Sequence, residues 1–203
     1  MLSSLPREIV IGIRVTIVFA IATLVYGLAI TGVGQAVFHD QANGSLVTKN
    51  GQVVGSKLIG QWIDPQNAKY FHPRPSATVD PATGSPLPYA GNNSTGSNLG
   101  PSSQTLVGRV ASSARSNSAQ YGTPNGGTPV DQVTTSFSGL DPDITEANAL
   151  NQADSVARAR NLDPAKVRAL VEKYVQGRIL WVFGEPHVNV LQLDMALDAG
   201  EAG

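Results

Sequence analysis

The sequence predicts an α+β protein in which a single N-terminal transmembrane helix precedes one mixed domain. Three observations support this fold class. Residues 15–38 carry no charged side chain, and the last third of the chain repeats apolar residues at helical spacing. Short runs of β-branched residues beside turn residues occur at both ends of the domain that remains. These patterns predict helices and short strands but leave the order of the strands open.

The uncharged stretch at residues 15–38 is long enough to cross a membrane. A helix of about 24 residues reaches roughly 36 Å, which exceeds the ~30 Å hydrocarbon core. A cleaved signal peptide is the alternative, with an apolar core of about 7–15 residues and a small-x-small cleavage site. The stretch here is longer, and no such site stands before His39. We therefore predict a retained membrane anchor.

Basic residues on the two sides of this anchor predict its orientation. Arg7 and Arg14 precede it, and the first basic residue after it is Lys49. Because cytoplasmic flanks carry the Lys and Arg excess, the N-terminus is expected inside the cell. The prediction is a cytoplasmic tail at 1–14, the transmembrane helix at 15–38 and one extracytoplasmic domain at 39–203, which would have no direct access to cytoplasmic nucleotides.

Composition limits the function classes. The chain has 14 Lys and Arg against 15 Asp and Glu, a net charge of -1, so it offers no basic field for nucleic acid. It has no cysteine, which excludes disulfides, Cys-ligated metals, a Cys nucleophile and a lipid attached through Cys. A secreted eukaryotic domain with this much loop usually carries disulfides, so the composition favours a bacterial protein.

Turn residues and caps divide the predicted domain into elements. Asn50-Gly51 predicts a tight hairpin, because both residues tolerate positive φ. Residues 78–101 and 116–129 are polar and rich in Gly, Pro, Ser and Asn, which predicts two long loops. A helix is expected between these loops, with Ser102 or Ser103 as its N-cap.

The C-terminal third has the most regular pattern. Asp143 and Glu146 have capping-box spacing at the head of one predicted helix. Asp163 and Pro164 are expected to open the next helix, which should end at Gly177. Two β-branched runs then predict strands at residues 179–183 and 188–193.

The sequence holds no catalytic motif of a familiar kind. It lacks phosphate-binding glycine loops, the G-x-S-x-G nucleophile turn and H-E-x-x-H. His39, His72 and His187 are far apart, so we predict no metal site and no catalytic residue, and no cofactor-binding residue can be assigned. Two hypotheses stay open: a free-standing anchored extracytoplasmic domain that binds a ligand or partner, or an anchored hydrolase that uses an unrecognised carboxylate pair.

Small residues recur along one face of the predicted transmembrane helix. Thr23, Gly27 and Thr31 are spaced four apart. Small side chains allow a second helix to approach closely inside a membrane. We therefore predict that these three residues face a partner helix.

Seven short motifs occur in a fixed order from the end of the predicted span almost to the C-terminus. They are residues 42–46 (ANGSL), 55–61 (GSKLIGQ), 70–77 (YFHPRPSA), 96–101 (GSNLGP), 138–142 (SGLDP), 156–160 (VARAR) and 184–190 (GEPHVNV). This series resembles the KdpC family, the C subunits of the bacterial high-affinity potassium-transporting Kdp ATPase.

The resemblance implies a non-catalytic accessory subunit of an ATP-driven potassium import complex in the bacterial inner membrane. Its implied partners are a potassium-channel-like subunit and a P-type ATPase subunit, with a very small single-span subunit as a further candidate, all in contact with membrane lipid. ATP and Mg would be used by the ATPase subunit through its own aspartate. The family is described as a catalytic chaperone that raises the ATP affinity of that subunit, but the predicted topology argues against direct ATP contact.

The motifs also suggest which side chains of the outer domain meet a partner. Arg74 stands between two prolines that hold its backbone extended. The full set of candidate partner contacts is Gln61, Phe71, Arg74, Asn98, Arg158 and Arg160. The chain departs from the family pattern at Gly27, where proline is usual, and at Ser155, where arginine is usual, so contacts of those residues are not transferred.

Overall fold

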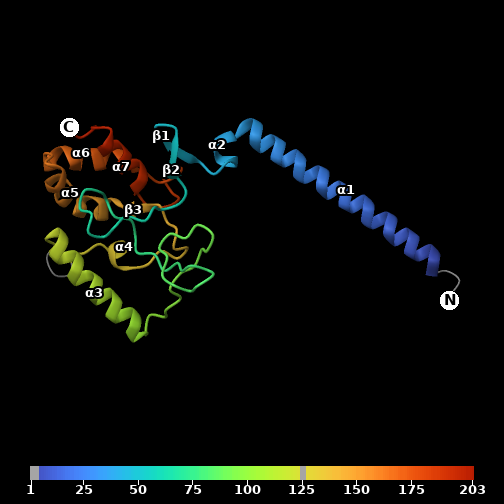
Figure 1. Cartoon of the computed structure of the whole chain (residues 1–203), viewed down its shortest axis with the longest axis horizontal. Helices are drawn as coiled ribbons and strands as arrows, with labels where there is room; N and C mark the ends of the chain where they lie inside the picture. The colour runs from blue at the N-terminus through green and yellow to red at the C-terminus, as the bar shows by residue number, and fades with distance from the viewer. Residues whose placement is uncertain (1–4, 124–126) are drawn as a thin grey trace. The chain divides into compact units, whose positions relative to one another are not determined.

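The computed structural model describes residues 5–123 and 127–203 (Figure 1). The chain divides into two compact units that meet in sequence between Leu46 and Val47. The first unit contains helices α1 (Leu5–Val37) and α2 (His39–Ala42). The second holds the mixed domain, so the helix and strand content agrees with the predicted α+β class.

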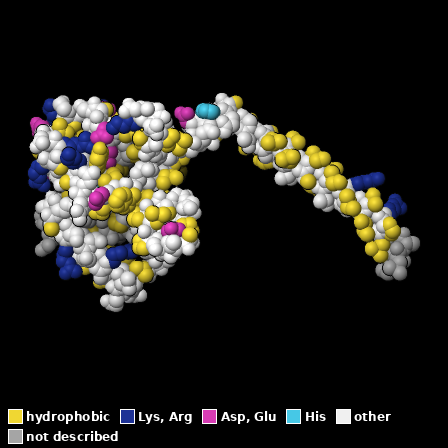
Figure 2. Space-filling model, viewed as in Figure 1, with side chains coloured by type: hydrophobic (Ala, Val, Ile, Leu, Met, Phe, Trp, Pro, Cys, Tyr) yellow, Lys and Arg dark blue, Asp and Glu magenta, His cyan; other side chains and the backbone are white. Residues whose placement is uncertain are grey.

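Helix α1 is one continuous helix of 33 residues with no buried residue. It is the one helix in the described part of the chain that is long and apolar enough to cross a membrane. Apolar side chains run along its visible side (Figure 2). The helix includes residues 5–14, which the sequence analysis had placed in a separate tail, because nothing after Pro6 breaks it and proline suits a first helical turn.

Strands β1 (Leu46–Lys49) and β2 (Gln52–Ser56) form the predicted hairpin. Asn50 and Gly51 connect them with φ values of 53° and 77°. Two positive φ values in a two-residue connection define the type I′ turn, whose twist matches that of the strands. The Asn-Gly signal is therefore confirmed.

A three-stranded antiparallel sheet lies at the centre of the domain. Its order is β3 (Asp143–Thr145), β5 (His187–Asn189), β4 (Val175–Gln176). Ile144 pairs with Val188, which also pairs with Val175 on its other side. Ile144 and Val188 are buried, so the middle of this short sheet contributes to the core.

Three helices enclose the rest of the core: α5 (Glu146–Arg160), α6 (Pro164–Tyr174) and α7 (Val190–Asp198). They gather together at one end of the domain (Figure 1). Alanines of α5 pack against larger side chains of the neighbouring helices, which allows the helices to lie close together. The core residues they supply are Ala149, Ala153, Val156, Ala157, Val167, Leu170, Val171, Val190, Leu193, Ala196 and Leu197.

The predicted helix caps are partly confirmed. Asp163 caps α6 by accepting from the amide of Ala165, as expected, although α6 ends at Tyr174 before Gly177. Asp143 does not cap α5, because it lies in β3; the cap is Thr145, whose hydroxyl accepts from Asn148. A strand that pairs up to residue 145 moves the helix start two residues along the chain.

The two C-terminal strands were predicted wrongly. Residues 179–183 form a tight turn with a single bridge between Ile179 and Phe183, not a paired strand. Strand β5 covers only His187–Asn189, and the chain then enters α7. The reason is the Asn189 side chain, which accepts from the amide of Gln192 and caps α7 in the middle of the apolar run.

The polar loop predicted at 116–129 is also corrected. Helix α3 (Gln104–Tyr121) continues through its first residues, and α4 (Val130–Val133) follows, with 124–126 outside the described residues. Ser103 caps α3 as expected. Its inward face ends in half-buried Asn117, Ser118 and Tyr121, so helical periodicity continues in polar residues that apolar pattern-matching does not register.

Candidate functional site

The segment at residues 70–77 runs extended between the helices and the loop at residues 78–101, and none of its residues is exposed. Pro73 and Pro75 have no amide hydrogen, so this stretch cannot pair as an ordinary strand. Its backbone groups must therefore find other partners if they are to be buried. Side chains from the helices provide those partners.

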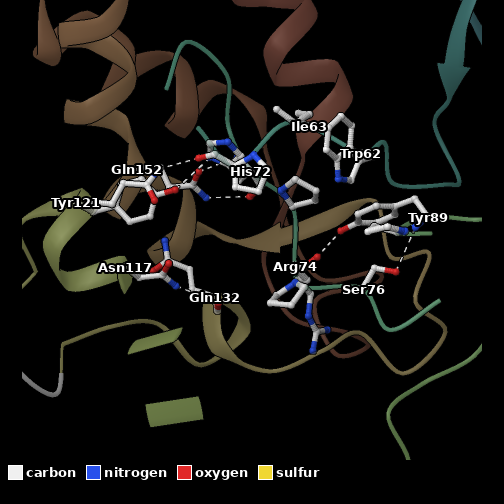
Figure 3. A pocket seen from close by; sticks show the side chains of 15 residues that line it. Trp62, Ile63, His72, Arg74, Ser76, Tyr89, Asn117, Tyr121, Gln132 and Gln152 are labelled. Atoms are coloured by element: carbon white, nitrogen blue, oxygen red, sulfur yellow. Dashed lines mark hydrogen bonds between the residues drawn. The ribbon is translucent and has the colours of Figure 1, made fainter. Parts of the chain in front are cut away.

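Gln152 of α5 takes the place of a neighbouring strand for His72. Its Oε1 accepts from the His72 amide at 2.7 Å, and its Nε2 donates to the His72 carbonyl at 3.0 Å (Figure 3). The same Nε2 donates to Asn148 Oδ1 at 2.7 Å, and Asn148 donates to Asp131 at 3.0 Å. Asp131 also accepts from the amide of Thr145 at 2.7 Å. This buried chain of polar groups fixes the segment to α4 and α5.

Arg74 is held inside the domain and does not extend freely from it. Its guanidinium donates to Asp141 at 2.9 Å, with both side chains about a quarter exposed. The hydroxyl of Tyr89 donates to the Arg74 carbonyl. Burial, with Asp141 second, raises the pKa of Tyr89, so this hydroxyl keeps its proton and remains a donor.

A cavity of about 300 Å³ opens beside this segment (Figure 3). Prolines, aromatic rings and amide side chains form most of its wall. The residues that line it are Trp62, Ile63, Pro65, His72, Pro73, Arg74, Pro75, Ser76, Pro88, Tyr89, Asn117, Gln120, Tyr121, Gln132 and Gln152.

His72 lies in this cavity as a neutral side chain. Its Nε2 lies 3.1 Å from the Asp64 carbonyl, which can only accept, so Nε2 carries the proton. Its Nδ1 then accepts from the Tyr121 hydroxyl at 3.1 Å. Burial lowers the pKa of His72 and raises the pKa of Tyr121 to about 12, so both groups remain uncharged at neutral pH.

The cavity has the chemistry of a binding surface. Its lining contains one histidine, one arginine and no carboxylate, and both nitrogens of His72 already have partners. Acid–base hydrolysis needs a nucleophile or water beside a group able to take a proton, and the lining residues do not supply that pair. Among the described residues, no group of His, Cys, Asp or Glu could hold a metal ion.

A second polar cluster holds the other end of the same segment. Arg160 donates to the Lys69 carbonyl at 2.5 Å and to Asp198 at 2.8 Å, and it lies 4.6 Å from the centre of the Tyr70 ring. Lys49 reaches Asp198 as well, at 2.9 Å. Arg160 therefore links α5 to α7 and to the start of the segment within the domain.

The structure separates the candidate partner contacts into three groups. Phe71 is fully buried in the core, so its assignment as a partner contact is corrected: an aromatic next to two prolines here fills the interior. Gln61, Arg74 and Arg160 make bonds within the domain, Gln61 to the Ile59 carbonyl at 2.8 Å. Asn98 and Arg158 are exposed and stay candidates for contact.

The small residues predicted to face a partner helix lie on α1, and the structure holds no partner against which to test that prediction. Thr23, Gly27 and Thr31 are exposed on the helix, and the Thr31 hydroxyl donates to the Gly27 carbonyl at 2.9 Å. A Cβ at Gly27 would meet nothing within 4 Å. Their role as a helix-packing face stays a prediction.

Sequence reasoning missed the residues that organise this region, above all Gln152, Asp131 and Tyr89. A signal for one of them was available. Asn148 and Gln152 stand four apart on α5, directly beside the buried Ala149 and Ala153, so two of the six buried residues of that helix are polar. Buried amides of this kind normally hold backbone groups that lack other partners.

The fold and the site together define a class: an α+β domain preceded by a helix able to span a membrane, with a polar-braced cavity and no catalytic pair among the lining residues. Comparison with known proteins narrows the class to one family. The family model described as "KdpC: K+-transporting ATPase, c chain" matches residues 9–199. The chain belongs to the KdpC family.

Individual relatives agree over nearly the whole length. The potassium-transporting ATPase KdpC subunit of Bradyrhizobium diazoefficiens is 48% identical over 188 residues, 90% of this chain and 92% of the relative. That of Sorangium cellulosum is 50% identical over 175 residues, 85% and 87% of the two chains. That of Methylobacterium nodulans is 46% identical over 203 residues, 98% of each.

Proposed function

We propose that this chain is a non-catalytic accessory subunit of an ATP-driven high-affinity potassium import complex, needed for assembly and for support of transport. One observation carries the proposal: the match to the family covers both α1 and the mixed domain, at close to half identity with potassium-transporting ATPase subunits. A chain similar over its membrane helix as well as its domain is expected to occupy the same place in such a complex.

In this complex the chemistry belongs to other subunits. A P-type ATPase subunit would hydrolyse ATP with Mg through its own aspartate, and a channel-like subunit would select potassium. This chain lacks the D-K-T-G sequence that carries such an aspartate. The apolar α1, with Thr23, Gly27 and Thr31 on one face, supports packing against a membrane-embedded partner.

We propose further that α1 crosses the inner membrane with its N-terminus in the cytoplasm and the mixed domain outside. Arg7 and Arg14 near the start of α1 support this orientation. With the domain outside, the chain raises the ATP affinity of the hydrolysing subunit only indirectly, through membrane helices or the channel-like subunit.

A pull-down tests the subunit assignment. The tagged chain is extracted in mild detergent from potassium-starved cells, and the proteins recovered with it are identified and assayed. We expect two large polytopic membrane proteins and a potassium-stimulated ATPase activity. Recovery of the chain alone, from membranes in which those proteins are present, would overturn the assignment.

The absence of cysteine makes the topology simple to test. Ser112→Cys places one thiol on the exposed side of α3. A membrane-impermeant maleimide should label intact spheroplasts of this variant, with the cysteine-free parent as control. Labelling only after permeabilisation would reverse the orientation, and ATP binding by the full chain alone would contradict indirect coupling.

A further inference from the structure

The tight turn at residues 179–183, called here the apolar tip, consists of Ile, Leu, Trp, Val and Phe. The five side chains are between 64% and 89% exposed, and Trp181 is the most exposed of them. Outside α1, the exposed large apolar residues of the described chain otherwise occur singly or as the pair Val53 and Val54. Contiguous apolar surface of this kind marks an interaction site in most soluble domains.

The backbone of the apolar tip makes its sequence unusual. Leu180 and Trp181 have φ values of 52° and 60°, the conformation that Asn50 and Gly51 adopt in the β1–β2 hairpin. Asn and Gly accept positive φ easily, whereas Leu and Trp are strained by it. Both turns are exposed, yet one has the residues that suit its backbone and the other keeps two large apolar side chains. Neither side chain packs into the core of the described domain.

The hydrogen bonds of the apolar tip also favour its burial against a partner. The amides of Ile179, Trp181, Val182 and Phe183 donate to carbonyls within residues 178–183, so these four amides would keep their partners on burial. At its base Arg178 donates to Glu185 at 2.6 Å. An apolar centre with a charged rim is the usual layout of a protein interface.

We propose that the apolar tip docks into an apolar socket on the outer face of a membrane-embedded partner subunit. This inference rests on the proposed function, because it requires a partner. The strained, internally bonded turn presents one fixed shape, which suits a fixed socket, whereas fluid lipid requires none. Anionic lipid surfaces attract unpaired basic residues, but Arg178 is neutralised by Glu185.

The size of the apolar tip agrees with a tethered partner. Five residues are far fewer than the roughly 20–30 per side of a stable, freely formed interface, so the tip is too small to hold a second copy of this chain alone. The first strand begins within about ten residues of the end of α1, so a partner packed on α1 stays close to the domain. At such high effective concentration a small anchor is sufficient.

The test compares Trp181→Gly with Phe137→Ala in the full complex. Glycine suits the positive φ of residue 181, so the variant removes the anchor without straining the turn. Phe137 is 91% exposed outside the tip and is the matched control. We expect Trp181→Gly to be lost from the complex about tenfold faster in detergent washes, as for a central interface residue, and the control to behave as the parent.

A photo-crosslinking residue in place of Leu180 identifies what the apolar tip touches. Illumination of the complex in lipid nanodiscs should give an adduct with a polytopic subunit. Adducts with lipid, or with a second copy of this chain, would overturn the inference, as would equal loss of the two variants. If the parent itself recovers no partner, the proposed function fails first, and the two failures are distinguishable.

Discussion

Two stretches of the domain reverse the usual relation between composition and burial. Residues 70–77 are rich in proline and polar groups, yet none of them is exposed. Residues 179–183 are entirely apolar, yet all five are more than 60% exposed. The backbone of the first stretch is hydrogen-bonded by its own domain through Gln152 and Asp194, and the described part of the domain covers the second stretch with nothing comparable. The difference separates residues that hold the domain together from residues that we propose connect it to a partner.

Gln152→Leu is the strongest test of the claim that residues 70–77 are held by their own domain. The change keeps the volume but leaves the amide and carbonyl of His72 and the side-chain oxygen of Asn148 without their bonds to Gln152. Buried groups left unpaired cost about 1–3 kcal/mol each, in part offset by the added apolar side chain. We expect a loss of about 3 kcal/mol in the free energy of unfolding, measured by urea denaturation of the full chain in detergent.

The control for this change is Gln120→Leu. Gln120 is exposed and only reaches the Pro65 carbonyl at 3.5 Å. Its replacement should change the free energy of unfolding by less than about 0.5 kcal/mol. Equal effects of the two variants would show that Gln152 does not brace the segment.

The next largest effect is expected from Arg160→Ala, with Arg158→Ala as its matched partner. Arg160 is 15% exposed at its side chain and bonds Lys69 and Asp198, whereas Arg158 is exposed. Bonds to a charged group contribute about 1.5–3 kcal/mol, so Arg160→Ala should cost about 2 kcal/mol and Arg158→Ala less than about 0.5. A larger loss of stability for Arg158→Ala would contradict the assignment of Arg160 as the residue that holds the domain together and of Arg158 as a surface residue.

Leu180→Gly tests whether the backbone of the apolar tip is strained. The change should stabilise the isolated chain. Relief of a positive φ gains about 1–2 kcal/mol, and the greater freedom of glycine in the unfolded chain removes about 0.5–1. A net gain of about 0.5–1 kcal/mol is expected. Ala111→Gly, on the exposed side of α3, should lose about 1 kcal/mol in the same denaturation assay, and a loss in both variants would contradict strain at the tip.

The sequence alone was informative where local chemistry decides the structure. The uncharged α1, the Asn50-Gly51 turn and the caps Ser103 and Asp163 all depend on residues within a few positions of one another. The family motifs also indicated correctly which family the chain belongs to. These features need no knowledge of distant contacts.

The sequence was misleading where partners decide the structure. A β-branched and aromatic run at 179–183 has the composition of a buried strand, and only the tertiary structure shows that it is an exposed turn. Phe71 and Arg160 were predicted as candidate partner contacts, but each is bonded within the domain to a segment more than 80 residues away, Asp194 for the Phe71 amide and Lys69 for Arg160. Contacts at such separations leave no local pattern.

Asp194→Asn is expected to change the free energy of unfolding least at acid pH. Its effect should depend on pH more specifically than that of the other variants. Asp194 is buried beneath the segment and accepts from the Phe71 amide at 2.9 Å. Burial raises the pKa of Asp194 well above the usual carboxyl value, although the Phe71 amide and Arg160 oppose the shift and Asp198 adds to it. The folded state therefore binds this proton more tightly than the unfolded state does.

It follows that the Asp194 contribution to stability is complete below the ordinary carboxyl pKa and is lost as pH rises through the raised value. Asparagine has the shape of the neutral acid at every pH and can still accept from Phe71. Asp194→Asn should match the parent near pH 4 and be the more stable protein at alkaline pH, in urea denaturation of the full chain across that range. Parallel stability curves for the two proteins would mean that Asp194 stays ionised in the fold and that Arg160 compensates its charge.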